Sequence, residues 1–146
     1  MIFTRRYPFR FGDIDRAGIG YYPRLLHYFH CCFEDWWAEG LGAPYPAVMR
    51  EENLGMPTVH LEVDYYAPVR YGDTPDVHLS VLRIGNSSVE FGFWMTLPDQ
   101  VRPLCRARVV TAAVAMDSMQ GRPLPDKWRQ QFERFRIAPE EFPSGR

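Results

Sequence analysis

Two aspartates, Asp13 and Asp15, lie in a segment with several glycines, directly before a run of apolar residues at helical spacing. An ionised carboxylate can attack a carbonyl carbon, or it can take a proton from a water molecule that attacks it. The start of a helix adds unpaired N–H groups and a partial positive charge, which suit a developing oxyanion. An aspartate needs no special environment to be ionised at neutral pH. This segment therefore has the groups needed to hydrolyse an activated carbonyl.

The same aspartates have a simpler interpretation, because aspartate beside glycine often shapes a turn or caps a helix. The residues alone leave both interpretations open. Several other catalytic patterns are absent: the chain has no G-x-S-x-G elbow, no phosphate-binding P-loop and no H-E-x-x-H helix. The acidic segment is therefore the strongest catalytic candidate in the chain.

A second group of polar residues, His27, His30 and Glu34, has the spacing of one helix face. Two imidazoles and a carboxylate could bind a metal ion there. A polar helix face or a subunit contact explains the same pattern more simply, so no metal site is predicted. The adjacent Cys31 and Cys32 are interpreted as packing residues, because no partnered base is identifiable.

The composition limits the class of protein. A length of 146 residues suits one domain, 1–146, and the formal charge of −1 provides no general attraction for nucleic acid. Three cysteines without framework spacing favour a reducing compartment. No stretch approaches the ~20 apolar residues of a membrane span, and none has the length of a signal peptide. We therefore expect a soluble cytoplasmic protein that binds a small molecule and associates with neither nucleic acid nor membrane.

Hydrophobic periodicity predicts the elements that must position the acidic segment. Residues 23–39 have the apolar spacing of a long helix, with Pro23 near its start and Gly40 at its end. A loop rich in proline and glycine follows, a short amphipathic helix is expected around 128–135, and the tail from about 139 to 146 is expected to fray. The predicted strands are 2–10, 58–66, 77–81, 89–97 and 104–116.

This order, a strand, a long helix and then four strands in succession, predicts the α+β class. One helix with about five antiparallel strands buries its apolar face only if the sheet curls around it. The outer face of such a sheet is left half apolar, so we expect a homo-oligomer, either a dimer or a dimer of dimers (a homotetramer).

The segment from Phe11 to Pro23, F-G-D-I-D-R-A-G-I-G-Y-Y-P, resembles the signature of the 4-hydroxybenzoyl-CoA thioesterase family. The resemblance implies a hotdog fold, and it implies that Asp15 is the catalytic nucleophile or general base. It further implies that the backbone N–H of Tyr22 polarises the thioester carbonyl. Gly12, Asp13 and Gly18 would then shape the loop, and no cofactor is needed beyond the CoA thioester substrate.

The chain departs from the family pattern at Arg16 and His30, and at the turn 85–87, where related enzymes can have a basic cluster for the CoA phosphates. Arg83, Ser87 and Ser88 are the candidate CoA contacts in its place. The predicted activity is hydrolysis of an acyl-CoA, with an aryl-CoA such as hydroxybenzoyl-CoA as one substrate. The alternatives are a non-catalytic acyl-thioester-binding module and a thioesterase for acyl groups on a carrier protein. A hydratase acting on the same thioesters ranks last.

Overall fold

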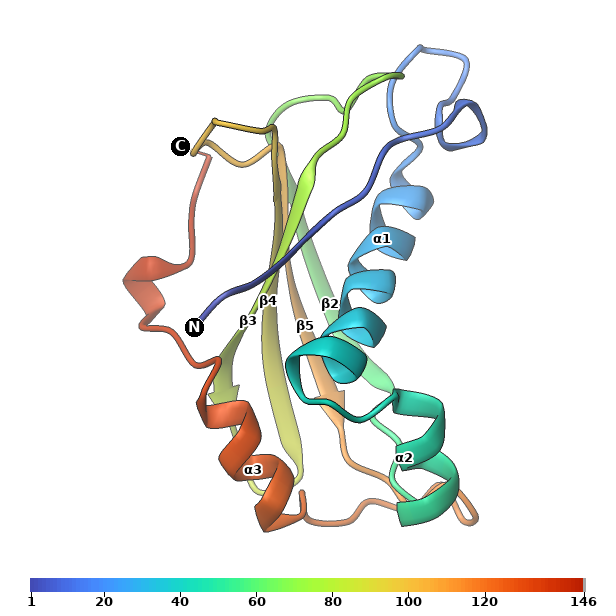
Figure 1. Cartoon of the computed structure of the whole chain (residues 1–146), viewed down its shortest axis with the longest axis vertical. Coiled ribbons are helices and arrows are strands. Elements are labelled where there is room, and N and C mark those ends of the chain that lie inside the picture. The colour runs from blue at the N-terminus through green and yellow to red at the C-terminus, as the bar shows by residue number, and fades with distance from the viewer. Residues whose placement is uncertain (146) are drawn as a thin grey trace.

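The computed structural model describes residues 1–145, which form a five-stranded antiparallel sheet in the order β1-β3-β4-β5-β2. Figure 1 shows helix α1 along one side of this sheet and the C-terminal segment along the other. The strands are β1 (Phe3–Arg6), β2 (Thr58–Tyr65), β3 (Asp76–Ile84), β4 (Ser88–Thr96) and β5 (Cys105–Ala112). The helices are α1 (Tyr22–Asp35), α2 (Tyr45–Glu52) and α3 (Asp126–Glu133). The predicted α+β class, with a long central helix and a short C-terminal helix, is confirmed.

The centre of the sheet is the predicted hairpin of β3 and β4, which pairs Ile84 with Val89 next to the turn. Alternate side chains of β3, namely Val77, Leu79 and Val81, are fully buried beneath α1. The two-residue period of these apolar side chains therefore decides which face of the sheet receives the helix. At the N-terminus the strand is shorter than predicted, because β1 ends at Arg6, before Pro8.

Helix α1 packs an apolar face that includes Leu25, Phe29 and Phe33 against the sheet. Its continuation, Trp36–Gly40, winds with the wider turn of a π-helix and buries both tryptophans. Gly40 is needed at its end, because a Cβ there would lie 2.8 Å from the Trp36 ring. The predicted helix 23–39 is therefore present, with a change of winding in its last part.

Helix α2 lies in the segment that was predicted to be a loop, so that prediction is wrong. Prolines near the first turn of a helix need no N–H partner, so Pro46 does not prevent the helix from starting. Tyr45 and Val48 are buried one turn apart, and Asn53 ends the helix in the left-handed conformation (φ 51°). Packing of these two side chains outweighs the unfavourable composition of the segment.

The part of the outer sheet face around Trp94 is covered by the chain itself. Phe142 is only 5% exposed, and its ring contacts Trp94 at 5.9 Å between centroids. The guanidinium groups of Arg106 and Arg108 each lie 5.0 Å from the centre of the Phe142 ring. The expected fraying from residue 139 is therefore wrong for 139–145, and residue 146 lies outside the described residues. This part of the outer face therefore supplies no reason for oligomerisation.

Strand β2 is more exposed than the half-exposed strand that was predicted, because it forms an edge of the sheet. Val59, Leu61 and Tyr65 are 61%, 43% and 51% exposed. Within residues 1–145, no helix has the length and hydrophobicity needed to cross a lipid bilayer.

Candidate active site

The acidic segment forms a tight turn before α1. The N–H of Asp15 donates to the carbonyl of Ile19 (2.9 Å), and the N–H of Gly18 donates to the carbonyl of Asp15 (3.0 Å). Gly18 has a φ of +82°, a conformation that disfavours other residues. The N–H of Gly20 donates to the carbonyl of Val69 (2.7 Å), which fixes the turn to the connection between β2 and β3. The turn is therefore held at both ends.

Asp13 is buried, with 2% exposure, and its carboxylate is fully engaged. It accepts hydrogen bonds from the Tyr28 hydroxyl (2.6 Å), the Arg24 guanidinium (2.8 Å) and the Arg10 backbone N–H (2.9 Å). Burial opposes ionisation, but these three donors outweigh it and hold the pKa of Asp13 below its usual value. Asp13 thereby joins the loop to the first two turns of α1.

Asp15 has a different environment, although it lies only two positions along the chain. It is half-buried, and its Oδ1 accepts one hydrogen bond, from the N–H of Ala17 (2.8 Å). Its Oδ2 accepts no hydrogen bond from the residues that the structure describes, and no arginine among them pairs with it. One carboxylate oxygen of Asp15 is therefore left for a ligand or a water molecule.

The first residue of α1, Tyr22, has an unpaired backbone N–H. The N–H groups of Arg24 and Leu25 both donate to the Tyr21 carbonyl (2.8 and 3.3 Å), and that of Tyr21 donates to the Asp13 carbonyl (2.8 Å). Pro23 has no N–H, and no residue in 1–145 accepts a hydrogen bond from the Tyr22 N–H. The positive end of the helix thus presents one free donor next to the acidic turn.

Gly12 lies in the short 3-10 helix Phe11–Asp13, and a Cβ added to it would meet nothing within 4 Å. The local packing in this chain therefore does not require glycine there, in contrast to the conformation of Gly18. The predicted role of Gly12 in shaping the loop stays a prediction.

A cavity of about 250 Å³ lies between α1 and the inner face of β2, β4 and β5. Most of its wall is aromatic or aliphatic, and His30 and Thr58 add polar groups. The lining residues are Leu26, Phe29, His30, Phe33, Tyr45, Met56, Pro57, Thr58, Leu61, Phe91, Phe93, Val109 and Thr111. The cavity is of a kind that holds a compact apolar group oriented by a few polar contacts.

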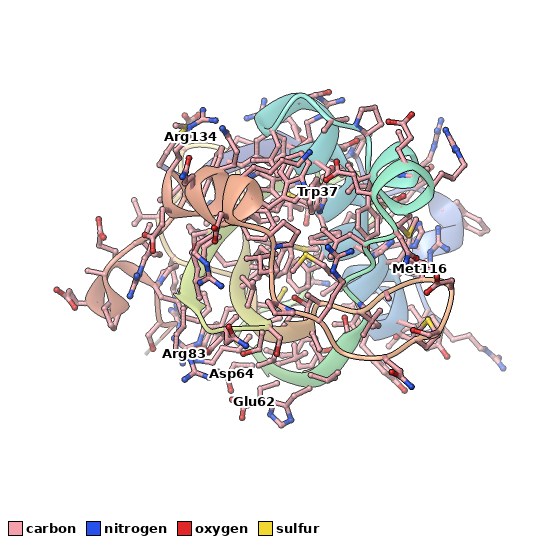
Figure 2. All side chains as sticks on the ribbon, turned by 90° about the horizontal axis from the view of Figure 1, so that it is seen from below. Trp37, Glu62, Asp64, Arg83, Met116 and Arg134 are labelled. Atoms are coloured by element: carbon pink, nitrogen blue, oxygen red, sulfur yellow. The ribbon has the colours of Figure 1, made fainter. Side chains whose placement is uncertain are left out.

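The predicted CoA contacts Arg83, Ser87 and Ser88 lie at the turn between β3 and β4. The acidic turn instead adjoins Val69 and Arg70, beyond the other end of the sheet. Figure 2 shows Arg83 on the same side of the molecule as Glu62 and Asp64, with Trp37 on the opposite side. Arg83 also lies 4.0 Å from the carboxylate of Glu90. One copy of the chain therefore does not bring these three residues together with Asp15.

The polar stripe of α1 divides into separate pairs. His27 contacts Cys31 (3.4 Å), and His30 contacts Glu34 (3.3 Å). Among residues 1–145, no group of three or more His, Cys, Asp or Glu is arranged to hold a metal ion. Burial raises the pKa of the Cys31 and Cys32 thiols, which disfavours the reactive thiolate.

Two parts of this site were not predicted from the sequence. Arg24 and Tyr28, which hold Asp13, are spaced i and i+4 on α1 and so share a face. That spacing could have identified them as partners of a residue beside the helix start. The cavity lining comes from α1, α2, β2, β4, β5 and the connection before β2, and no local pattern in the sequence brings these six segments together.

The chain matches the model of the thioesterase-like superfamily over residues 9–132. It is 32% identical over 138 residues to the 1,4-dihydroxy-2-naphthoyl-CoA hydrolase of Synechococcus sp. strain CC9605, covering 89% of this chain and 91% of that protein. The corresponding hydrolase of Synechococcus elongatus is 28% identical over 119 residues, 81% of this chain and 85% of that protein.

Among solved structures, a thioesterase superfamily protein from Jannaschia sp. CCS1 superimposes with a TM-score of 0.85 at 25% identity, covering 93% of this chain and 94% of that one. The predicted hotdog fold is thereby confirmed. The narrower resemblance to 4-hydroxybenzoyl-CoA thioesterases stays a prediction. The family model covers the acidic turn, α1, the whole of β2 to β5 and nearly all of α3, and the chain belongs to the thioesterase-like superfamily.

Proposed function

We propose that this protein hydrolyses an aryl-CoA thioester to the free acid and CoA, with Asp15 as the catalytic carboxylate. The observation that carries the proposal is that the loop leading into α1 holds a carboxylate with one unpaired oxygen, and that the first N–H of α1 is unpaired as well. The superfamily of the chain and the activity named for its relatives make a thioester the expected substrate class.

In the proposed reaction, the carbonyl oxygen of the thioester accepts a hydrogen bond from the Tyr22 N–H. Asp15 then either attacks the carbonyl carbon or takes a proton from a water molecule that attacks it. The tetrahedral intermediate collapses, the C–S bond breaks, and the CoA sulfur leaves and is protonated. In the nucleophilic route, water afterwards cleaves the anhydride formed with Asp15. Either route consumes one water molecule and changes no oxidation state, so we expect no cofactor.

The position of the cavity supports this arrangement. With a rise of 1.5 Å per residue, Leu26 lies about 6 Å along the helix from Tyr22, and Phe33 lies about 16 Å from it. Both Leu26 and Phe33 line the cavity. An acyl group whose carbonyl lies at the helix start therefore extends along α1 into the cavity.

An aryl group suits this cavity better than a long flexible chain. Phe29, Phe33, Phe91 and Phe93 line it, and the ring centroids of Phe29 and Phe93 lie 5.5 Å apart. His30 and Thr58 can form hydrogen bonds with ring hydroxyls. The proposed substrates are thus hydroxylated aryl thioesters, a class that includes hydroxybenzoyl-CoA and the dihydroxynaphthoyl-CoA named for the relatives.

We further propose that two copies associate through β2. This edge strand has eight residues, of which Val59, Leu61 and Tyr65 are exposed and apolar. The opposite edge, β1, has four residues, and two of them, Arg5 and Arg6, form ion pairs. The longer edge strand, with apolar side chains exposed along it, is the one that pairs more readily with another strand. Leu61 belongs to both β2 and the cavity wall, so a second copy would enclose the acyl group. Sedimentation of the wild type tests this, with a dimer or a dimer of dimers expected and an active monomer contradicting it.

The activity is tested by following thiol release from a panel of aryl-CoA and alkyl-CoA thioesters with the wild type and Asp15→Asn. The wild type is expected to prefer hydroxylated aryl thioesters, and Asp15→Asn is expected to lower kcat by about 100-fold or more. Absence of turnover with every thioester contradicts the proposed activity. Near wild-type turnover by a folded Asp15→Asn variant would mean that the protein is a thioesterase but that Asp15 is not its catalytic residue.

A further inference from the structure

Two aromatic side chains beside the acidic turn are left in solvent. Phe11 is 81% exposed and Tyr71 is 63% exposed, and their rings meet edge to face with centroids 6.0 Å apart. Exposed aromatic residues are common singly, but a pair of this kind forms a surface that can accept another flat ring.

Both rings belong to turns that are fixed by hydrogen bonds. Phe11 begins the 3-10 helix Phe11–Asp13, which the hydrogen bond from the Arg10 N–H to the Asp13 carboxylate holds in place; Asp13 with its three donors is called the anchor below. Tyr71 lies in a turn in which the Arg70 N–H donates to the Asp73 carboxylate (2.8 Å) and the Asp73 N–H donates to the Arg70 carbonyl (3.0 Å). A hydrogen bond from the Phe9 N–H to the Asp73 carbonyl (2.9 Å) joins the two turns. The pair is therefore organised before any ligand binds.

Three exposed arginines, Arg10, Arg16 and Arg70, lie in the chain segments that carry this aromatic pair or adjoin it. Arg10 precedes Phe11, Arg16 lies in the acidic turn, and Arg70 precedes Tyr71 and is bridged to Ile19. None of the three guanidinium groups forms an ion pair or a hydrogen bond with the residues that the structure describes, whereas eight other arginine and lysine side chains are ion-paired. Unpaired guanidinium groups are available for phosphate.

We propose that Phe11 and Tyr71 bind the adenine of CoA and that Arg10, Arg16 and Arg70 bind its phosphates. This inference rests on the proposed function, because it assigns the nucleotide end of the substrate whose thioester meets Asp15. An aromatic surface beside guanidinium groups is the combination that binds a base together with its phosphates.

The distances along the chain favour this location over the turn that carries Arg83. The segment from Phe11 to Asp15 can span at most about 14 Å, which the phosphopantetheine arm of CoA covers. Strand β3 alone runs for nine residues between the acidic end of the sheet and that turn, about 30 Å at the rise of a strand. Within one copy, the nucleotide therefore has its binding groups on the same end as the thioester.

The test compares two substrates that share one aryl group, the CoA thioester and the N-acetylcysteamine thioester, which lacks the nucleotide. The variants are Phe11→Ala combined with Tyr71→Ala, and Arg10→Ala combined with Arg70→Ala. Each is expected to lower kcat/KM for the CoA thioester by about 10-fold, through KM, and to leave the truncated thioester unchanged. Arg50→Ala, which alters an exposed arginine of α2, is the matched control.

Equal losses on both substrates, or no loss on either, overturn the assignment. A selective loss in Arg83→Ala instead of the two double variants also overturns it, because the nucleotide would then lie at the turn between β3 and β4. A change in sedimentation of the aromatic double variant overturns it as well, since the pair would then be a contact between copies.

Binding of adenosine 3′,5′-bisphosphate, measured by calorimetry, provides a readout that does not depend on activity. The wild type is expected to bind it, and each double variant is expected to bind about 10-fold more weakly. If the wild type hydrolyses no thioester yet binds this nucleotide through Phe11 and Arg70, the proposed function fails and the nucleotide site stands. If the wild type hydrolyses thioesters but binds no nucleotide, the proposed function stands and the nucleotide site fails.

Discussion

The acidic loop contains two carboxylates in opposite situations. The anchor at Asp13 is buried and saturated by three donors, while the turn at Asp15 leaves one carboxylate oxygen without a partner. A buried carboxylate that accepts hydrogen bonds at both oxygens stabilises the fold but is not accessible to a substrate. Two residues of the same type in one short loop therefore differ in what they can do: Asp13 holds the loop, and Asp15 is left for the proposed chemistry.

The first prediction tests whether Asp15 serves activity and not stability. The variant Asp15→Glu keeps the charge and moves the carboxylate by one methylene. Misplacement on this scale is expected to lower kcat by about 100-fold, because the reacting atoms no longer align. The melting temperature should stay within about 4 °C of the wild type, since Asp15 makes a single hydrogen bond with the turn. Thiol release and calorimetry measure the two effects. A large drop in melting temperature would show that Asp15 also holds the fold.

The second prediction concerns the anchor. Asp13→Ala leaves the Tyr28 hydroxyl and the Arg10 N–H without their acceptor, and it should lower the free energy of unfolding by about 2 kcal/mol. Urea denaturation measures the change. Any loss of activity should follow the loss of folded protein, and a stable but inactive Asp13→Ala variant would break the proposed division.

The third prediction removes one donor from the anchor. Burial and the bond to Asp13 raise the pKa of Tyr28 to about 12, so its hydroxyl stays protonated and donates over the physiological range. Tyr28→Phe should lower the free energy of unfolding by about 1 kcal/mol and leave the Arg24 bond in place. A double-mutant cycle with Asp13→Ala is the appropriate measurement, and additive effects would mean that the two side chains are not coupled.

The smallest expected effect is the pH dependence of the anchor. Because the pKa of Asp13 is lower in the folded state than in the unfolded chain, its contribution to stability is fully present above about pH 4. The contribution is lost as the pH falls through the lowered folded-state pKa. The stability difference between the wild type and Asp13→Asn should therefore be largest near pH 7 and narrow below pH 4. Urea unfolding at both values checks it, and a constant difference contradicts the prediction.

Local periodicity was sufficient to predict the sheet and the central helix. The alternation in β3 and β4 and the apolar face of α1 each depend on residues close together in the chain. Helix α2 was missed because its two buried side chains give too short a pattern to outweigh the surrounding prolines and glycines. The covering of the outer face by Phe142 depends on cation–π contacts across the sheet, which have no local signal.

The site was predictable to a smaller extent. The acidic loop and the helix start were found because they are continuous in the sequence, and the resemblance to a family signature separated Asp15 from Asp13. The contacts that keep Asp13 occupied come from the next elements of the fold. The proximity of Phe11 to Tyr71 depends on a hydrogen bond between distant loops, so the aromatic pair is visible only in three dimensions.

The contact between Phe142 and the outer face has a consequence for synthesis of the protein. Strands β3 and β4 leave the ribosome well before Phe142 does, so Trp94 has no cover while the intervening chain is still being made. During that interval the sheet exposes an apolar surface, and chains that stop before Phe142 expose it permanently. The exposure of this apolar surface therefore ends only when Phe142 has been added and has packed on Trp94.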